Sequence, residues 1–301
     1  MKSPWIAALR SVALTVPDLA AAETFYTQVW RLAVAERAAG RIYLRGSGAD
    51  HHLLALHLRP GTPQILKVTL RARSAAALEA TAAATAAVGG TVEQMVAAST
   101  DLSGGQTVLL RDAHGRRYEV VHGDSRRTAE EPAPPDMPQR LAHAVLNSHD
   151  VPAAQGFLER ALGFQLADRT RIMAFMNCDR DHHTIAIGDT DNDALNHVAF
   201  VMPTLDAVMR GGGRMKDAGH GIEWGPGRHG PGDNAFNYFI DPFGIVIEYT
   251  AEVEQIDDSY HVRGPQDWTW PPGRVDQWGI SAPPSARLKE AQRAVHFSSS
   301  P

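Results

Sequence analysis

The chain of 301 residues is long enough for about two domains of ordinary size, and its 44% hydrophobic and 21% charged residues are typical of a globular protein with a substantial core. The net charge of −5 disfavours broad electrostatic binding to nucleic acid or to an anionic membrane surface. A single cysteine, Cys178, excludes an intrachain disulfide, and no apolar run approaches the roughly 18 residues of a membrane span. We therefore expect a soluble cytoplasmic protein with no nucleic-acid or membrane partner.

The first half of the chain begins with a predicted strand over residues 11–16. Asp18 follows it as the N-cap of an amphipathic helix that extends to Trp30. A second helix is predicted over residues 75–88. The turn at residues 112–115 then leads into a closing strand.

The second half repeats this series of elements. A strand over residues 143–147 precedes Asp150, the N-cap of the next amphipathic helix. A second helix is predicted over residues 205–218, and we expect the glycines at 211–213 to fray it. Asp241-Pro242-Phe243-Gly244 predicts the turn of the last hairpin, with the Asp241 carboxylate as a local acceptor.

The two series are copies of one unit. Asp18 corresponds to Asp150 and Asp112 to Asp241, so the offset between the copies changes only from 132 to 129 residues, which indicates a duplication with small loop deletions. The predicted division is an N-terminal domain at 5–124, a proline-rich linker at 125–139, a C-terminal domain at 140–253 and a tail at 254–301. We expect the tryptophan-containing tail to pack on the folded body.

Three potential metal ligands lie on separate predicted strands of the second unit. His143 is on the first strand, His197 on a middle strand and Glu248 on the last, each among apolar residues. One such histidine is more often a hydrogen-bonded core residue, but a buried carboxylate is costly unless it is paired or coordinated. Two histidines and one carboxylate with open positions are the ligand set of non-haem Fe(II) oxygenases. The set predicts a divalent metal centre.

The first unit lacks this ligand set. Ser11 stands at the position of His143 and Lys67 at that of His197, while Glu119 corresponds to Glu248. A serine hydroxyl is a poor ligand, and a protonated lysine has no lone pair. We expect Lys67 to pair with Glu119 in place of a metal.

The chain resembles the vicinal-oxygen-chelate superfamily and, within it, the two-domain type I extradiol ring-cleaving dioxygenases. The resemblance covers residues 5–253 and rests on the three predicted ligands and on three stretches of sequence. These stretches are LNHVAF at 195–200, GRHGPGDNAFNYFIDPFG at 227–244 and IVIEYT at 245–250. The resemblance implies an α+β fold of two tandem glyoxalase/bleomycin-resistance/dioxygenase domains, each of paired βαβββ modules in a curved open mixed sheet. It also implies that the C-terminal domain holds the metal.

The resemblance further implies catalytic roles for three residues around the metal. His183 would stabilise oxygen and act as acid and base, whereas its neighbour His182 would face the other way on a strand. His229 and Tyr238 would hydrogen-bond the oxygens of a catechol-type diol and orient its ring, and O2 would be the second substrate. The implied cofactor is Fe(II), with Mn(II) compatible with the same ligands.

The substrate is less constrained by the sequence. Val145 shares a strand face with His143, and Phe175 lies on the strand before His183, so apolar side chains are expected to line the site. Both monocyclic and bicyclic diols fit. A glyoxalase-like isomerase, a thiol transferase and a non-catalytic ligand-binding protein of the same superfamily are the alternatives. Exposed sheet edges and the aromatic tail favour a homo-oligomer.

Overall fold

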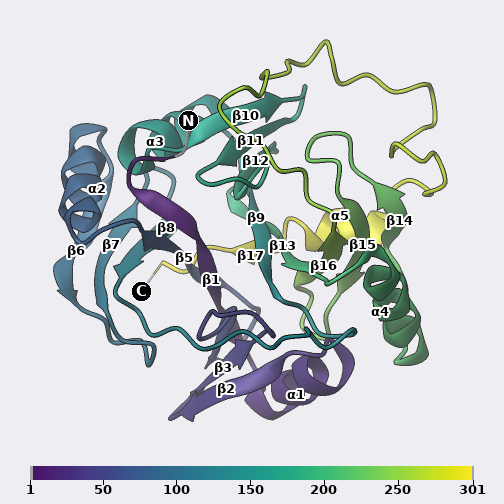
Figure 1. Ribbon diagram of the computed structural model, residues 1–301, viewed down its shortest axis with the longest axis horizontal. Helices are drawn as coiled ribbons and strands as arrows, with labels where there is room; N and C mark the ends of the chain where they lie inside the picture. Colours follow the sequence, from purple (N-terminus) through teal and green to yellow (C-terminus); the bar gives the residue numbers. More distant parts are fainter. Residues whose placement is uncertain (1–2, 300–301) are drawn as a thin grey trace.

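The computed structural model describes residues 3–299, and each half of the chain forms its own open mixed β-sheet (Figure 1). The first sheet contains β1 (Ile6–Val16), β2 (Ala33–Ala38), β3 (Arg41–Arg45), β4 (Leu54–Leu58), β5 (Ile65–Ala72), β6 (Thr91–Ala98), β7 (Gln106–Arg111) and β8 (Arg117–His122). The second contains β9 (Arg140–Ser148), β10 (Gln165–Arg169), β11 (Met173–Asn177), β12 (Ile185–Asp189), β13 (Ala194–Val201), β14 (Trp224–Arg228), β15 (Ala235–Ile240) and β16 (Val246–Ala251).

Helices connect the strands and cover the sheets. They are α1 (Leu19–Thr24), continued by the π-helical turn η1 (Phe25–Val29), α2 (Ala76–Ala87), α3 (Val151–Leu162), α4 (Leu205–Asp217) and α5 (Ala286–Ala291). Asp18 and Asp150 cap α1 and α3, because their carboxylates accept the backbone N–H groups of Ala21 and Ala153. Both predicted N-caps are confirmed. No helix in the described part of the chain is long and apolar enough to cross a membrane.

The strand order is the same in the two sheets. The first runs β2-β3-β4-β1-β5-β8-β7-β6 and the second β10-β11-β12-β9-β13-β16-β15-β14. In each sheet the first strand pairs parallel with the last strand of its own βαβββ module and antiparallel with the first strand of the next module. The predicted α+β fold of paired βαβββ modules is confirmed, whereas the domain boundaries remain a prediction.

The glycines at 211–213 do not fray α4, so that expectation was wrong. The helix runs unbroken because its glycines allow it to lie close against the sheet. A Cβ atom added at Gly211 would lie 2.7 Å from the ring of Tyr249, and one at Gly212 would lie 3.0 Å from the Asn237 amide. The packing of this face compensates for the poor helix propensity of glycine.

The two units share one continuous hydrophobic core. Trp30 of the first unit stacks on Tyr249 of β16 with ring centroids 3.6 Å apart, and the Tyr249 hydroxyl donates to the Trp30 carbonyl. On the other side, Phe157 of α3 stacks on Tyr118 of β8. Buried aromatic pairs of this kind stabilise an interface beyond the area they bury. The position of the second sheet is therefore fixed against the first.

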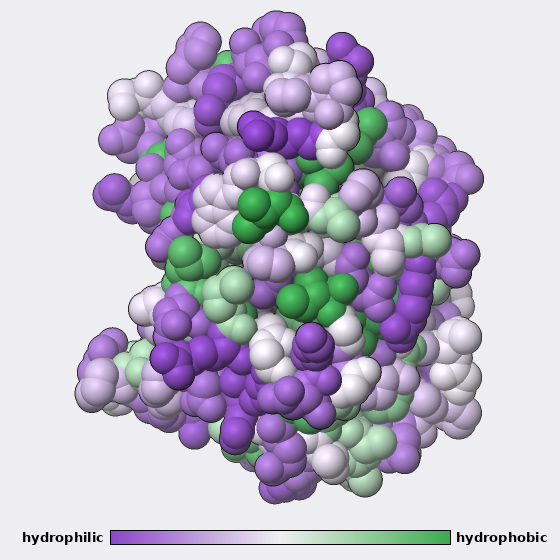
Figure 2. Space-filling model, turned by 90° about the vertical axis from the view of Figure 1, so that its right-hand side faces the viewer, coloured by the Kyte–Doolittle hydropathy of each residue, from purple (hydrophilic) through white to green (hydrophobic). Residues whose placement is uncertain are grey.

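Most of the tail lies along the second unit, and its end at Phe297 and Ser298 reaches β5 of the first unit (Figure 1). Its short strand β17 (Val295–His296) pairs with β13, and the backbone of Glu254 accepts the N–H of His182. Trp268 and Trp270 lie against the loop at Gly230. On the face shown in Figure 2, polar residues surround separate apolar patches. Exposed apolar side chains of α4 and the tail include Met209, Trp270, Trp278 and Ile280.

Asp241 occupies the turn between β15 and β16 and links it to the first unit. Its carboxylate accepts the backbone N–H groups of Phe243 and Ile245, as the turn predicted, and it also accepts the Tyr26 hydroxyl at 2.9 Å. Burial raises the pKa of Asp241 to about 6, although the hydrogen bonds from Ile245, Tyr26 and Phe243 oppose the shift. Above about pH 6 the folded protein therefore holds a buried negative charge at Asp241, which lowers the free energy of unfolding.

Asp241→Asn is expected to stabilise the protein at neutral pH relative to the wild type. The native pKa lies above the ordinary value of 3.8, so the stability contributed by protonating Asp241 is full below pH 3.8 and is lost as the pH rises through about 6. Asparagine keeps an acceptor for the backbone and carries no charge. The advantage of the variant should grow by on the order of 3 kcal/mol between pH 4 and pH 7 in denaturant unfolding. A pH-independent difference between the two proteins would contradict this account.

Candidate metal centre

His143, His197 and Glu248 come from three strands that are neighbours in the second sheet, β9, β13 and β16. The Nε2 atoms of the two histidines lie 3.4 Å apart. Oε2 of Glu248 lies 3.3 Å from Nε2 of His143 and 3.1 Å from Nε2 of His197. All three side chains are buried, and Glu248 is 0% exposed. The structure thus brings the three residues predicted as ligands to one point inside the sheet.

The electrostatics of this cluster suit a cation. Burial by itself would raise the pKa of Glu248, but hydrogen bonds with His143, His197 and His229 hold that pKa well below its usual value. Burial lowers the pKa of His197 to about 4, so its imidazole is neutral at pH 7. No lysine or arginine among residues 3–299 forms an ion pair with Glu248. The ionised, buried carboxylate of Glu248 therefore contacts imidazoles and lacks a permanent positive partner among these residues.

Two asparagines hold the ligands from outside. Oδ1 of Asn196 lies 2.8 Å from Nδ1 of His197, so it can accept the Nδ1 proton when Nε2 gives its lone pair to a metal. Asn234 is fully buried and donates to Oε1 of Glu248 at 3.4 Å and to the Thr250 hydroxyl at 2.7 Å. The donor types, their burial and these outer hydrogen bonds fit a divalent metal.

The residues expected around the metal also lie at the cluster. The ring of His183 is 4.3 Å from that of His143, measured between centroids. The Tyr238 hydroxyl lies 3.0 Å from Nε2 of His229 and 3.3 Å from Nε2 of His197. Nε2 of His229 is 3.8 Å from Oε1 of Glu248. Of these side chains only His229, at 19%, keeps appreciable exposure.

Protonation differs among these outer residues. Burial raises the pKa of Tyr238 well above its usual value, and the nearby charge of Glu248 adds to this, so the phenol remains a hydrogen-bond donor. Burial and the neighbouring His143 lower the pKa of His183 well below its usual value, so this imidazole is neutral. The cluster therefore combines a fixed donor with a neutral nitrogen base.

The apolar residues expected at the substrate form a small buried cluster beside His183. Val145 and Phe175 pack with Ala186, and the Phe175 ring lies 5.1 Å from that of His183. The expectation that His182 and His183 belong to a strand was wrong, since β12 begins only at Ile185. Their rings nevertheless diverge, with an angle of 85° between the planes.

The first unit contains cations where the second has ligands. Nζ of Lys67 lies 2.5 Å from Oε1 of Glu119, which confirms the predicted pair. Arg10 adds a second positive charge. Its guanidinium donates to the Ser11 hydroxyl at 2.7 Å and lies 2.5 Å from Nε2 of His52. Lys67 thus balances Glu119, the counterpart of Glu248, whereas Arg10 pairs with Asp101 and Asp124.

Lys67→Ala is expected to leave the metal content of the protein unchanged while lowering its stability. The change leaves the Glu119 carboxylate, which is 7% exposed, without its cation. We expect a loss of about 1–3 kcal/mol in the free energy of unfolding. Elemental analysis after dialysis and denaturant titration measure the two quantities. Loss of metal from this variant would place the metal in the first unit.

Sequence patterns missed several residues that shape the site. Asn196 stands directly before His197, and that adjacency was an available signal for an outer partner of a metal-bound histidine. Trp224, whose ring lies 5.2 Å from that of His229, carried no such signal. Asp168, which is bonded to His182, was also missed, because it comes from a different strand.

Comparisons with known proteins agree with this geometry. A sequence profile of the Glyoxalase/Bleomycin resistance protein/Dioxygenase superfamily matches residues 140–249. The Mn(II)-bound glyoxalase from Novosphingobium aromaticivorans superposes with a TM-score of 0.85 at 32% identity, covering 96% of this chain and 94% of that protein. The chain therefore belongs to the Glyoxalase/Bleomycin resistance protein/Dioxygenase superfamily.

Extradiol dioxygenases are among its relatives, which confirms the resemblance predicted from the sequence. Metapyrocatechase 2 of Cupriavidus necator is 32% identical over 178 residues, covering 56% of this chain and 51% of that protein. The match thus spans about half the length of this curated relative. Homoprotocatechuate 2,3-dioxygenase of Arthrobacter globiformis shares the fold, with a TM-score of 0.85 at 23% identity over 99% of this chain and 94% of that protein.

Proposed function

We propose that this protein cleaves a catechol-type diol with O2, next to the two hydroxyl groups, at a centre held by His143, His197 and Glu248. The observation that carries the proposal is the buried set of two imidazoles and one ionised carboxylate. Three protein ligands leave coordination positions open for substrates. Fe(II) is the metal we propose, and Mn(II) suits the same donors, as the Mn(II)-bound relative illustrates.

The metal would supply Lewis acidity and would hold the diol and O2 together. The protein's own groups account for the rest of the proposed chemistry. Tyr238 stays protonated and, with His229 at 3.0 Å, offers hydrogen bonds to the diol oxygens. His183 is neutral and buried, so it can take up a proton that the diol releases.

The surroundings favour an uncharged aromatic substrate. Val145 and Phe175 are 1% and 8% exposed and contribute only apolar surface beside His183. A phenyl-sized ring that leaves water and packs against these side chains would bury no unpaired polar group there. Both monocyclic and bicyclic diols remain within the proposal.

A second candidate is an isomerase, which is favoured by one observation. One solved relative, matched at 32% identity over 94% of its length, is a glyoxalase. Against this candidate, Ser11 and Lys67 of the first unit are engaged with Arg10 and Glu119 and lie outside the cluster of ligands. Three protein donors and a phenol donor suit dioxygenation better.

The deciding experiment compares metals and substrates. The protein is stripped of metal with a chelator, then loaded anaerobically with Fe(II), Mn(II) or Zn(II), and mixed with catechols of one and two rings in aerated buffer. We expect O2 uptake equal to the diol consumed and a yellow ring-opened product with Fe(II) or Mn(II), and none with Zn(II). Conversion of a glutathione hemithioacetal without O2 uptake would instead establish the isomerase.

A further inference from the structure

Behind His183 lies a second row of buried polar groups that the proposed chemistry does not use. Nδ1 of His183 is 3.1 Å from Nδ1 of His182, and Nε2 of His182 is 2.9 Å from Oδ2 of Asp168. His182 and Asp168 are both 0% exposed. Two fully buried polar side chains joined end to end to a proposed acid–base group require an explanation.

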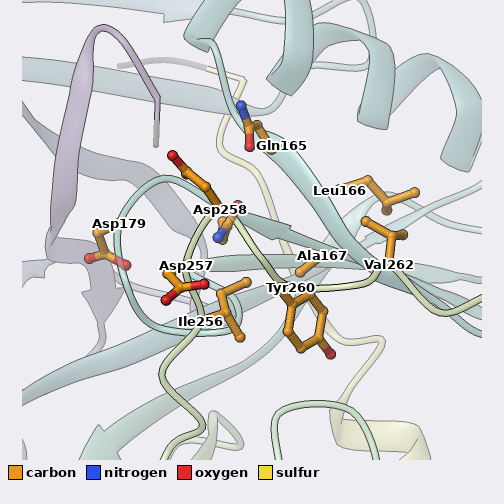
Figure 3. A pocket seen from close by; sticks show the side chains of 10 residues that line it. Gln165, Leu166, Ala167, Asp179, Ile256, Asp257, Asp258, Tyr260 and Val262 are labelled. Atoms are coloured by element: carbon orange, nitrogen blue, oxygen red, sulfur yellow. The ribbon is translucent and has the colours of Figure 1, made fainter. Parts of the chain in front are cut away.

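Asp168 is surrounded by donors, so its carboxylate acts only as an acceptor. The Tyr260 hydroxyl donates to Oδ2 at 3.0 Å, and the backbone N–H of Arg263 donates to Oδ1 at 2.8 Å. The Arg263 guanidinium lies 3.4 Å from Oδ2. Tyr260 and Arg263 belong to the tail, and Figure 3 shows Tyr260 beside Ala167, the residue before Asp168 on β10.

An acceptor at Asp168 determines the protons along the whole row. Nε2 of His182 must carry a proton to donate to the carboxylate, and where this is the only proton of the ring, Nδ1 is left as an acceptor. Nδ1 of His183 must then carry the proton between the two rings, which leaves Nε2 of His183 unprotonated. We propose that Asp168 and His182 are positioning residues that hold His183 in the tautomer whose Nε2 can accept a proton.

The first unit supports this assignment independently. There Glu36, His51 and His52 occupy the places of Asp168, His182 and His183, with Nδ1 of His51 and His52 3.0 Å apart and Nε2 of His51 3.5 Å from Glu36. The guanidinium of Arg10, which can only donate, lies 2.5 Å from Nε2 of His52. Nε2 of His52 is therefore unprotonated, as proposed for its counterpart.

The two rows differ in what faces the free nitrogen. In the first unit, Arg10 occupies Nε2 of His52. In the second unit, Ala142 stands at the position of Arg10, and no arginine of residues 3–299 is hydrogen-bonded to His183. The duplicated row thus leaves a nitrogen available only in the unit that holds the ligand cluster. Its use on a diol rests on the proposed function, whereas the tautomer does not.

The test reads the tautomer directly by NMR of histidine ring nitrogens. Full-length protein labelled with 15N-histidine is measured metal-free and loaded with diamagnetic Zn(II), and the His183 signals are assigned by their loss in His183→Phe. The variant is His182→Phe, which keeps a ring between Phe175 and Tyr260 and removes both nitrogens. His51→Phe makes the same change in the first unit and is the matched control.

We expect the wild type and His51→Phe to show His183 protonated at Nδ1. In His182→Phe, Nδ1 has no acceptor, so the proton should move to Nε2, and kcat for a catechol should fall about tenfold with KM nearly unchanged. Protonation of Nε2 in the wild type, or an unchanged tautomer in His182→Phe, would overturn the proposal. If the tautomer shifts as expected but the wild type cleaves no diol, the positioning role stands and the proposed function fails.

Discussion

His143→Ala is expected to abolish metal binding and ring cleavage together. Its Nε2 lies 3.4 and 3.3 Å from the other two donor atoms, so the change removes one of the three donors. Four-ligand zinc sites contribute about 10–16 kcal/mol, so one ligand contributes about 3–4 kcal/mol. Metal affinity should therefore fall by a factor on the order of 10² to 10³. Elemental analysis after dialysis and O2 uptake with a catechol measure both effects.

Ser11→Ala is the matched control for this change, since Ser11 occupies the position of His143 in the first unit. It removes a hydroxyl that accepts from Arg10 and touches no proposed ligand. Metal content and turnover should stay close to those of the wild type. Retention of metal by His143→Ala, or its loss from Ser11→Ala, would refute the assignment of the centre to the second unit.

His183→Phe is expected to separate metal binding from turnover. The ring of His183 packs 4.3 Å from that of His143 and 5.1 Å from that of Phe175, so a phenyl ring suits the space. The three ligands are untouched, and metal content should remain normal. Loss of a positioned acid–base group lowers kcat by about 10²- to 10⁴-fold. Single-turnover measurements on the Fe(II)-loaded variant should show slow ring opening after normal diol binding.

The corresponding substitution in the first unit, His52→Phe, serves as its control. His52 bonds with His51 and Arg10 and lies outside the proposed centre. We expect unchanged turnover from this variant, with some loss of stability because Arg10 loses a buried partner. Equal rates for His183→Phe and the wild type would remove His183 from the chemistry and leave the metal ligands unaffected.

The two units surround an equivalent buried carboxylate with different side chains. Glu119 and Glu248 occupy equivalent positions, and both are buried. Glu119 is paired with Lys67 at 2.5 Å, whereas Glu248 contacts imidazoles, the Asn234 amide and the Tyr238 hydroxyl, and no lysine or arginine of residues 3–299. A charge in a low-dielectric interior needs a partner in either case. In the first unit the chain provides this partner through Lys67, and in the second we propose that a metal provides it.

The sequence alone determined the features that depend on local order along the chain. The repeat offset paired Asp18 with Asp150, and one ligand on each of three predicted strands marked His143, His197 and Glu248. Both predictions follow from the order of side-chain types within short segments, because the period of a helix or strand decides which face each side chain lies on. The family resemblance added His183, His229 and Tyr238.

The tertiary structure alone decided which separate segments meet. Helix α4 remains unbroken because Gly211 fits closely against Tyr249. His182 is hydrogen-bonded to Asp168, which in turn accepts the Tyr260 hydroxyl of the tail. No spacing rule connects such residues, because their contacts arise from the packing of elements that are distant in the chain. The same packing buries Glu248, so that its ionised carboxylate needs a positive partner. The sequence predicted this burial only from the apolar residues beside Glu248.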